Sequence, residues 1–258
     1  DELIRQMDAA GVRRGVVLSV AYHFGNPFRP PVANEYARVR AENDWSAAQA
    51  KRYPDRLIVF CGINPLQDYA LREIRRCAGD PLLRRGLKLH FGNSDVEMDK
   101  PRHVERLQMV FAAANRYKMP IVVHLRPNID HQRPWESRQA RIFLEQVLPR
   151  APGVVVQIAH LAGPGRMDSP GIPEALEVFS DAIAARDPRV ENLYFDLAVS
   201  GWEAKPDLFA RQLRRIGLSR LLYGSDSPPD RAWKEFRKFP LTAAELQQIE
   251  ENIAPYLR

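Results

Sequence analysis

The sequence lacks the marks of several protein classes. No stretch of about 18 consecutive apolar residues occurs in its 258 residues, so we expect no membrane-spanning helix. No charged segment followed by an apolar run opens the chain, so no signal peptide is expected in it. Residues 1–11 instead have the pattern of the last turns of an amphipathic helix. The two cysteines, Cys61 and Cys77, are too few for a disulfide framework or a zinc finger, and we expect both to be free and buried.

The charge balance is basic, with 38 Lys and Arg against 32 Asp and Glu and a net charge of +6. Such a surplus can serve nucleic acids or anionic substrates. The basic residues are spread over predicted helices beside acidic neighbours, and no motif of basic and stacking aromatic residues accompanies them. We therefore predict a small-molecule substrate and neither a nucleic-acid nor a membrane partner, and we leave homo-oligomerisation open.

Short apolar runs alternate with amphipathic stretches along the whole chain. The runs are rich in Val, Ile and Leu and are bounded by Gly, Pro or Asp, which is typical of buried parallel strands. The predicted strands are 15–21, 57–63, 86–90, 121–125, 154–161, 193–199 and 221–225. The predicted helices are 34–53, 69–78, 103–118, 138–148, 172–185, 207–216 and 242–257.

This alternation predicts an α/β fold with parallel strands and right-handed crossovers. Seven strands suit an open doubly wound sheet or most of an eight-stranded barrel. A doubly wound dinucleotide-binding sheet needs G-x-G-x-x-G after its first strand, and the nearest approach, at 163–165, contains a proline. We therefore predict one (β/α)8 TIM-barrel domain over residues 1–258, with its first strand absent from these residues.

Polar residues gather at the carboxyl ends of the predicted strands, where barrels of this type carry function. Four of the six histidines lie there. Because every second strand residue faces the interior, three of the strands each end in an inward-pointing metal-binding group. The three predicted interior faces are Val122, His124 and Arg126; Val156, Ile158 and His160; and Leu222, Gly224 and Asp226.

His124, His160 and Asp226 form the predicted metal site. Neutral imidazoles and a carboxylate in a concave site are ligands of a divalent metal, zinc above all. Each residue also has a structural alternative, since a lone histidine at a strand end is usually a core residue and Asp226 can cap the segment that follows. Three such residues on strands of one barrel favour the metal site.

Seven segments carry a family resemblance: 7–12 (MDAAGV), 86–90 (GLKLH), 120–124 (PIVVH), 157–163 (QIAHLAG), 192–196 (NLYFD), 223–228 (YGSDSP) and 251–252 (EN). In this order they resemble the amidohydrolase superfamily. The specific likeness is to the amidohydrolase-related group that includes aminocarboxymuconate-semialdehyde decarboxylase, resorcylate-type decarboxylases and pyrone-dicarboxylate lactonase. The strand-five histidine and the Gly-Ser-Asp-x-Pro signal are the most specific matches.

The resemblance implies roles for the matching residues. His124 matches the strand-five metal ligand, and Asp226 matches the strand-eight carboxylate, which touches the metal and handles a proton. His160 matches the strand-six histidine, which is a ligand in some members and an acid/base in the decarboxylases. Lys88 lies where distant members carry a carboxylated lysine, but we expect it to pair with a charge inside the barrel.

One motif of the family is missing. The family's first strand ends in His-x-His, which supplies two further ligands, and no His-x-His occurs in these residues. Segment 7–12 aligns with the helix after that strand, so the motif would precede Asp1. Retention of His124, His160 and Asp226 favours an omitted segment over a degenerate site. The compartment stays open between cytoplasm and periplasm, because an omitted segment can also hold a signal.

Two reactions suit such a site. The first is hydrolysis of an ester, lactone or amide by a metal-activated water, with Asp226 and His160 as the catalytic residues. The second is non-oxidative decarboxylation on the same scaffold, because a fold does not fix the reaction. A third possibility is a metal-free barrel that binds without catalysis.

Four further residues are predicted to contact the substrate. Arg126 can hold a carboxylate with two parallel hydrogen bonds. Tyr22 and His90 follow other strands, and Trp135 lies in the loop after Arg126. These groups indicate a small carboxylated or aromatic substrate whose identity the sequence does not give.

Overall fold

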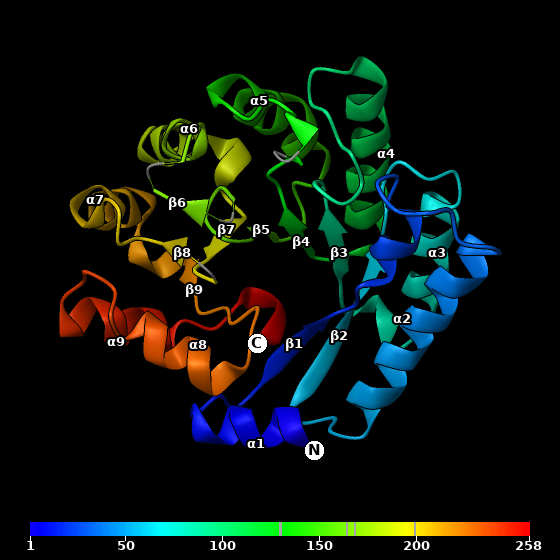
Figure 1. The fold of residues 1–258 in the computed structure, drawn as a ribbon, viewed down its shortest axis with the longest axis horizontal. Helices are drawn as coiled ribbons and strands as arrows, with labels where there is room; N and C mark the ends of the chain where they lie inside the picture. The colour runs from blue at the N-terminus through cyan, green and yellow to red at the C-terminus, as the bar shows by residue number, and fades with distance from the viewer. Residues whose placement is uncertain (129–130, 164, 168, 199) are drawn as a thin grey trace.

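The computed structural model describes residues 1–128, 131–163, 165–167, 169–198 and 200–258. In this part of the chain seven parallel strands form one curled sheet (Figure 1). They are β1 (Gly15–Leu18), β2 (Leu57–Ile63), β3 (Leu87–His90), β4 (Ile121–His124), β5 (Val156–Ile158), β7 (Leu193–Asp196) and β9 (Leu221–Leu222). A separate pair is formed by β6 (Gly165–Arg166) and β8 (Ser200–Gly201).

Helices follow the strands and cover the outside of the curled sheet (Figure 1). They are α1 (Glu2–Ala9), α2 (Glu35–Lys51), α3 (Ala70–Gly79), α4 (Pro101–Tyr117), α5 (Ser137–Ile142), α6 (Ile172–Ala184), α7 (Pro206–Ile216), α8 (Pro229–Phe236) and α9 (Ala243–Glu251). No helix among the described residues has both the length and the apolar character needed to cross a membrane.

The strand order β1-β2-β3-β4-β5-β7-β9 confirms the predicted fold of TIM-barrel type. Each strand pairs in parallel with the next, and the helix between them makes the crossover. Within the described residues no pairing joins β1 to β9, so the sheet curls without closing.

All seven predicted strands are present, most of them shortened at their ends, and α1 lies within the predicted amphipathic start. Helix α8 was not predicted; it begins at Pro229, after Pro228 at the N-cap position, and proline suits a first helical turn. The predicted helix 242–257 is wrong in length, because α9 ends at Glu251 and a separate turn, η8 (Pro255–Leu257), follows. A capping box of Thr242 and Glu245 begins α9.

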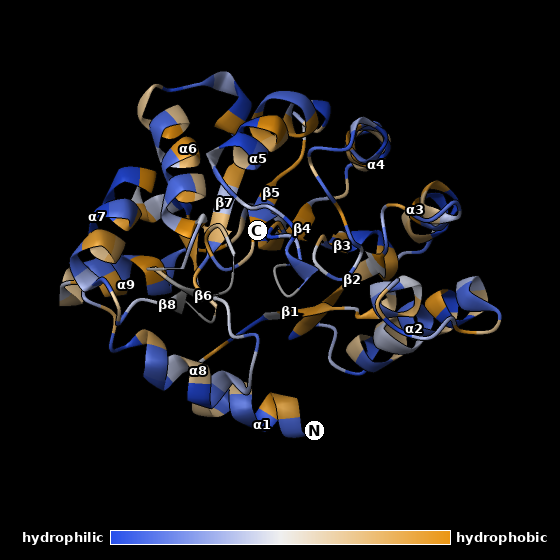
Figure 2. Cartoon of the chain, turned by 45° about the horizontal axis from the view of Figure 1, so that its top comes forward, coloured by the Kyte–Doolittle hydropathy of each residue, from blue (hydrophilic) through white to orange (hydrophobic). Residues whose placement is uncertain are grey.

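Apolar side chains form two layers, one on each face of the sheet. The large layer lies between the strands and the helices, and the two-coloured helices of Figure 2 show the apolar sides that supply it. The small layer lies inside the curl, which turn η8 enters near the C-terminus (Figure 1). Its members and packed neighbours are Ile58, Phe60, Val122 and Ala159 with Val16, Leu18, Tyr256 and Leu257.

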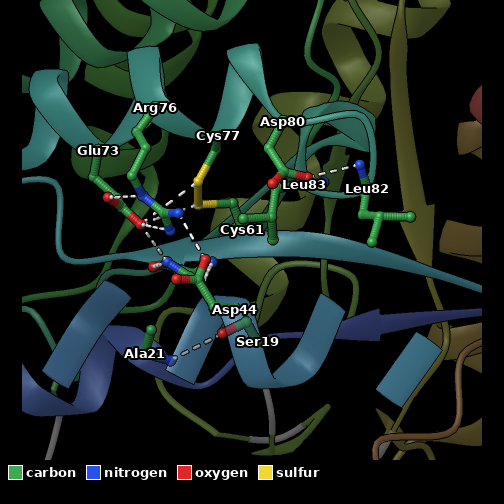
Figure 3. The surroundings of a disulfide bond; sticks show 12 residues. Ser19, Ala21, Asp44, Cys61, Glu73, Arg76, Cys77, Asp80, Leu82 and Leu83 are labelled. Atoms are coloured by element: carbon green, nitrogen blue, oxygen red, sulfur yellow. Dashed lines mark hydrogen bonds and ion pairs between the residues drawn. A yellow bond between two sulfur atoms is a disulfide. The ribbon is translucent and has the colours of Figure 1, made fainter. Parts of the chain in front are cut away.

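The cysteines depart from prediction. Cys61 on β2 and Cys77 on α3 form a disulfide with a Cα–Cα distance of 6.5 Å (Figure 3), so the expectation of free thiols is wrong, although both are buried. Cys61 faces outward from the sheet and Cys77 faces inward from the helix. Strand and helix periodicities place each residue on a buried face, but neither predicts that the two faces meet at these positions.

Candidate active site

The site begins with two neighbouring histidines at strand ends. His90 ends β3 and His124 ends β4, and the parallel register pairs them directly. Their rings stack with centroids 3.8 Å apart and planes 12° from parallel. Because parallel strands end at one edge of the sheet, the two imidazoles meet at the carboxyl ends, where barrels of this type bind ligands.

Both imidazoles are held in the neutral form. Burial, reinforced by the charge of Lys88, lowers the pKa of His90 to about 3. Burial and then the neighbouring His90 lower the pKa of His124 well below its ordinary value. Two cationic rings could not share this stack, so a neutral pair is what the geometry demands.

The hydrogen bonds of His90 assign its ring nitrogens. Its Nδ1 accepts from the backbone N–H of Asn93 at 3.1 Å, so the proton of the neutral ring lies on Nε2. An Nε2–H is a donor and offers no lone pair to a metal. His90 is therefore suited to donate to a substrate, the role that the sequence predicted, and His124 is left as the ligand of the pair.

His160 reaches the site by a different route from the predicted one. Val156 and Ile158 pack in the outer layer and Ala159 in the inner one, so the predicted interior face of β5 is wrong in phase. The chain then turns at His160 and Leu161, whose φ values are +57° and +63°. Each left-handed non-glycine residue costs about 1–2 kcal/mol, and together the two break the alternation and return His160 to the interior.

Hydrogen bonds hold His160 in this conformation. Its backbone N–H donates to Asp196 Oδ1 at 2.9 Å, and its Nδ1 lies 2.8 Å from the carbonyl oxygen of Ala198. Because a carbonyl only accepts, Nδ1 carries the proton. The lone pair of Nε2 is thereby directed to Asp226, whose Oδ2 lies 3.8 Å away.

Asp226 lies beyond the end of β9, which is shorter than predicted. Its φ of +44° is again left-handed, and its side chain is 63% exposed against 6% for His160. Tyr22 completes this side of the site with its ring 5.1 Å from His90. Burial and then the charge of Asp226 raise the pKa of Tyr22 to about 12, so its hydroxyl keeps its proton.

Two basic side chains are buried beside these groups. Burial lowers the pKa of Lys88, and the charges of Asp196 and Asp226 oppose that shift, so its predicted charge pairing stays a prediction. Arg126 is also buried, two residues beyond His124. A Cβ at Gly163 would lie 2.7 Å from the Arg126 side chain, so the turn after His160 packs closely against this arginine.

Loops after three strands meet above the site. Phe28 and His131 stack with ring centroids 3.8 Å apart, and Arg133 binds Asp95 through two hydrogen bonds of 2.8 and 2.9 Å. Trp135, in the same loop, is not brought to the histidines but packs in the outer layer, so its predicted contact with substrate lacks support. Residues 129 and 130 of this loop lie outside the described residues.

The chemistry of the groups that meet here suits a divalent metal, because imidazole nitrogens and carboxylate oxygens bind such ions. His160 Nε2 and Asp226 Oδ2 lie 3.8 Å apart. His124 adds a second neutral imidazole, its ring 5.3 Å from that of His160. The ligand atoms of His124, His160 and Asp226 are more widely spaced than those of Cys61, Glu73 and Cys77, which lie within 4.8 Å of one another. The sulfurs of Cys61 and Cys77, however, are bonded to each other in a disulfide.

The His-x-His ligands predicted before Asp1 stay a prediction. The residues that sequence reasoning placed least well are Asp196 and Gln157. The sequence analysis assigns no role in the site to either residue, and the incorrect phase of β5 would turn Gln157 away from Asp196, to which it donates. The signal that could have found Asp196 is its carboxylate in an otherwise apolar strand.

The profile of the amidohydrolase family matches residues 1–251. The chain belongs to the amidohydrolase family. A comparison of this amidohydrolase with curated proteins finds no match. Membership makes the chain an enzyme of the amidohydrolase superfamily with a divalent metal as its expected cofactor.

Several solved structures share the amidohydrolase fold. The 5-carboxyvanillate decarboxylase LigW from Sphingomonas paucimobilis is 18% identical with a TM-score of 0.67, covering 97% of this chain and 80% of its own. The 2,6-dihydroxybenzoate decarboxylase from Rhizobium is 18% identical with a TM-score of 0.66, covering 96% and 84%. A dihydroxybenzoic acid decarboxylase from Polaromonas sp. JS666, solved with manganese, is 16% identical with a TM-score of 0.63, covering 96% and 82%.

Proposed function

We propose that this amidohydrolase-family enzyme is a metal-dependent, non-oxidative decarboxylase of a small aromatic or unsaturated carboxylic acid. The observation that carries the proposal is the orientation of His160, whose Nδ1–H is bound by the Ala198 carbonyl while Nε2 is directed at Asp226. This is a pair that can hold and deliver a proton. The structures of similar fold supply the substrate class, since their names are those of aromatic acid decarboxylases.

Substrate binding follows from the charges in the site. The Arg126 guanidinium is always charged and can bind a carboxylate with two parallel hydrogen bonds. Lys88 adds a second buried hydrogen-bond donor, and the Nε2–H of His90 can donate to a ring substituent. An anionic substrate with hydroxyl or carbonyl groups beside its carboxylate suits all three.

The reaction breaks the bond between the carboxylate carbon and the carbon that bears it. The bonding electron pair stays on the bearing carbon, CO2 leaves, and a proton held between His160 and Asp226 moves to that carbon. The balance is R–COO⁻ plus H⁺ giving R–H and CO2. Asp226 is exposed, so it can be reprotonated from solvent for the next cycle.

His124 and Asp226 would hold the divalent cation, and His160 would stay free to carry the proton. Bound there, the cation supplies positive charge that orients the substrate's oxygen atoms and stabilises the charge that develops during the reaction. The sequence predicts zinc, whereas the Polaromonas decarboxylase structure holds manganese. The identity of the ion is therefore one readout of the test.

Hydrolysis at the same site is the second candidate. Its support is the exposure of Asp226, because a general base that activates water must reach water. The same assays separate the two reactions, since only decarboxylation releases CO2 and places a solvent proton on carbon.

The test incubates protein loaded with zinc or manganese with hydroxybenzoic acids, and separately with aryl esters and lactones. We expect CO2 release and, in D2O, one deuterium on the ring of the product. His160→Gln should lower kcat by about 10²–10⁴-fold, the usual contribution of a general acid or base, with metal content unchanged. His131→Gln, which alters an exposed histidine, is the control. Ester or lactone hydrolysis without CO2 release would establish the second candidate instead.

A further inference from the structure

A series of polar side chains, linked by hydrogen bonds and here called the hydrogen-bond chain, joins the C-terminal turn to the candidate active site. The Tyr256 hydroxyl on η8 donates to Gln157 Oε1 on β5. The side-chain Nε2 of Gln157 donates to Asp196 Oδ2 on β7 at 2.7 Å, and Asp196 Oδ1 accepts from the backbone N–H of His160 at 2.9 Å. The chain therefore runs through the interior of the sheet, from η8 to the residue that faces Asp226.

The middle of this series is buried. Gln157 is 7% exposed and Asp196 is 5% exposed, while the half-buried Tyr256 packs the edge of its ring against Phe60, with ring centroids 5.2 Å apart. Polar atoms so deeply buried need protein partners, because an unpaired one is strongly unfavourable. Each hydrogen bond of the chain is thus a constraint on its neighbours.

The donors and acceptors allow one arrangement of the chain. Asp196 accepts N–H donors at both oxygens, which is the behaviour of a carboxylate. The amide NH2 of Gln157 must then face Asp196, since the opposite orientation would bring the amide oxygen against the carboxylate. Gln157 Oε1 is left to accept from Tyr256, so the Asp196 carboxylate fixes the orientation of the amide and the tyrosine hydroxyl donates to the oxygen that remains.

Asp196 holds His160 in two ways. Its Oδ1 accepts from the backbone N–H of His160 and, at 3.2 Å, from that of Ala198. The carbonyl of Ala198 in turn accepts from Nδ1 of His160 at 2.8 Å. One carboxylate thus sets both the left-handed backbone of His160 and the peptide that selects its tautomer.

We infer that Asp196 is the positioning residue for His160, and that Gln157 and Tyr256 anchor Asp196 from the opposite end of the sheet. Asp196 and Tyr256 touch no reacting atom. Their effect is to keep the His160 proton on Nδ1 and the lone pair of Nε2 directed at Asp226. The kinetic consequence of this inference rests on the proposed function, whereas its structural consequence does not.

Asp196→Asn tests the inference with almost no change of shape. The amide NH2 that replaces one oxygen faces either the two backbone N–H groups, donor against donor, or Gln157, whose amide must then turn over and donate to the Tyr256 hydroxyl. In either case the two backbone N–H groups lose their charged acceptor. We expect the Ala198 carbonyl to lose its hold on Nδ1 and His160 to populate the Nε2–H tautomer. Tyr256→Phe keeps the ring against Phe60 and removes only the hydroxyl, so it should produce a smaller change in the same direction.

The first readout is the ring ¹⁵N chemical shifts of histidine-labelled protein, with His160→Gln used to assign the His160 signals. We expect the wild type to show His160 as the Nδ1–H tautomer. Asp196→Asn and, more weakly, Tyr256→Phe should change the His160 signals. The matched control is Tyr117→Phe, since Tyr117 packs by its ring against the outer layer. Unchanged His160 signals in both variants would overturn the inference, whatever the enzyme's substrate.

The second readout is kinetic. We expect Asp196→Asn to lower kcat by about 10–100-fold, the usual effect of removing a residue that orients a functional histidine, with KM within about twofold and a displaced pH profile of kcat. The combined loss in the double variant Asp196→Asn with Tyr256→Phe should differ from the sum of the two single losses, because both residues act through the same series of hydrogen bonds. Additive losses of kcat would show that Asp196 and Tyr256 do not act through one series of hydrogen bonds, and would contradict the inference. Altered His160 signals in a protein that never releases CO2 would instead reject the proposed function and leave the inference standing.

Discussion

His90 and His124 carry a consequence for the acid stability of the fold. The pKa of His90 is about 3 in the folded protein, against about 6.5 in an unfolded chain. Between these pH values His90 binds a proton in the unfolded chain, whereas in the folded protein its ring stays neutral. The free energy of unfolding therefore falls as pH drops from about 6.5 toward 3, by up to about 1.4 kcal/mol per pH unit for such a histidine. Above pH 6.5 this contribution is constant.

His90→Gln tests that assignment. The Gln carbonyl can still accept from the Asn93 N–H, but the side chain cannot titrate. We expect urea unfolding between pH 4.5 and 8 to show a shallower loss of stability in the variant than in the wild type. The comparison uses the slope, because the substitution also changes the packing against His124 at every pH. Parallel curves for the two proteins would contradict the depressed pKa.

His160 shows why part of the site lies beyond sequence reasoning. Simple alternation was right for His124, since β4 runs regularly to its last residue. Alternation also predicted that His160 points to the interior, but for the wrong reason. The residues of β5 face the opposite way from the prediction, and the two left-handed residues that follow reverse the direction again. A left-handed non-glycine residue is stabilised by distant groups, here the carboxylate of Asp196, which lies 36 residues further along the chain. No pattern in the neighbouring sequence predicts such a turn.

At the scale of elements, the strands and their order were predictable, and the contacts between individual helix and strand residues were not. Short runs of Val, Ile and Leu identify buried parallel strands whatever their neighbours are. The disulfide between β2 and α3 depends instead on how the helix is rotated over the strand. The same buried corner holds the Glu73 carboxylate, which accepts from Arg76 and from Asn43 of α2 (Figure 3 shows Glu73 and Arg76).

The disulfide should be a substantial part of the stability of this corner. It closes a loop with a sequence separation of 16 residues, and a loop of about 15 residues corresponds to about 3 kcal/mol. We expect Cys61→Ala combined with Cys77→Ala to lower the free energy of unfolding by about 2–4 kcal/mol, measured with urea. The wild type should lose a similar amount under a thiol reductant, whereas the double variant should not respond. A wild type indifferent to reductant would refute this.

At the scale of the molecule, a bound divalent cation links the site to global stability. A ligand that binds only the folded state adds about 2.7 kcal/mol when its concentration is 100 times Kd. Because His124 and Asp226 follow different strands, β4 and β9, one ion would join distant parts of the sheet. Chelation should therefore destabilise the whole fold and not only the site.

We expect chelation of the metal-loaded protein to lower Tm by several degrees, and readdition of zinc or manganese to restore it. Scanning calorimetry measures the effect. His124→Ala should abolish the response to metal while the fold is retained. A response that persists in this variant would place the ion elsewhere, for which the cluster of Cys61, Glu73 and Cys77 in reduced protein would be the first place to look.

The apolar layer inside the curl draws residues from both ends of the chain. Val16 and Leu18 belong to β1, while Tyr256 and Leu257 belong to η8. During synthesis, the outer layer can assemble unit by unit as successive strands and helices leave the ribosome. The inner layer must wait until residue 257 has emerged. A nascent chain stalled before that point would expose the interior of the sheet, and this interval is when chaperones would matter most to it.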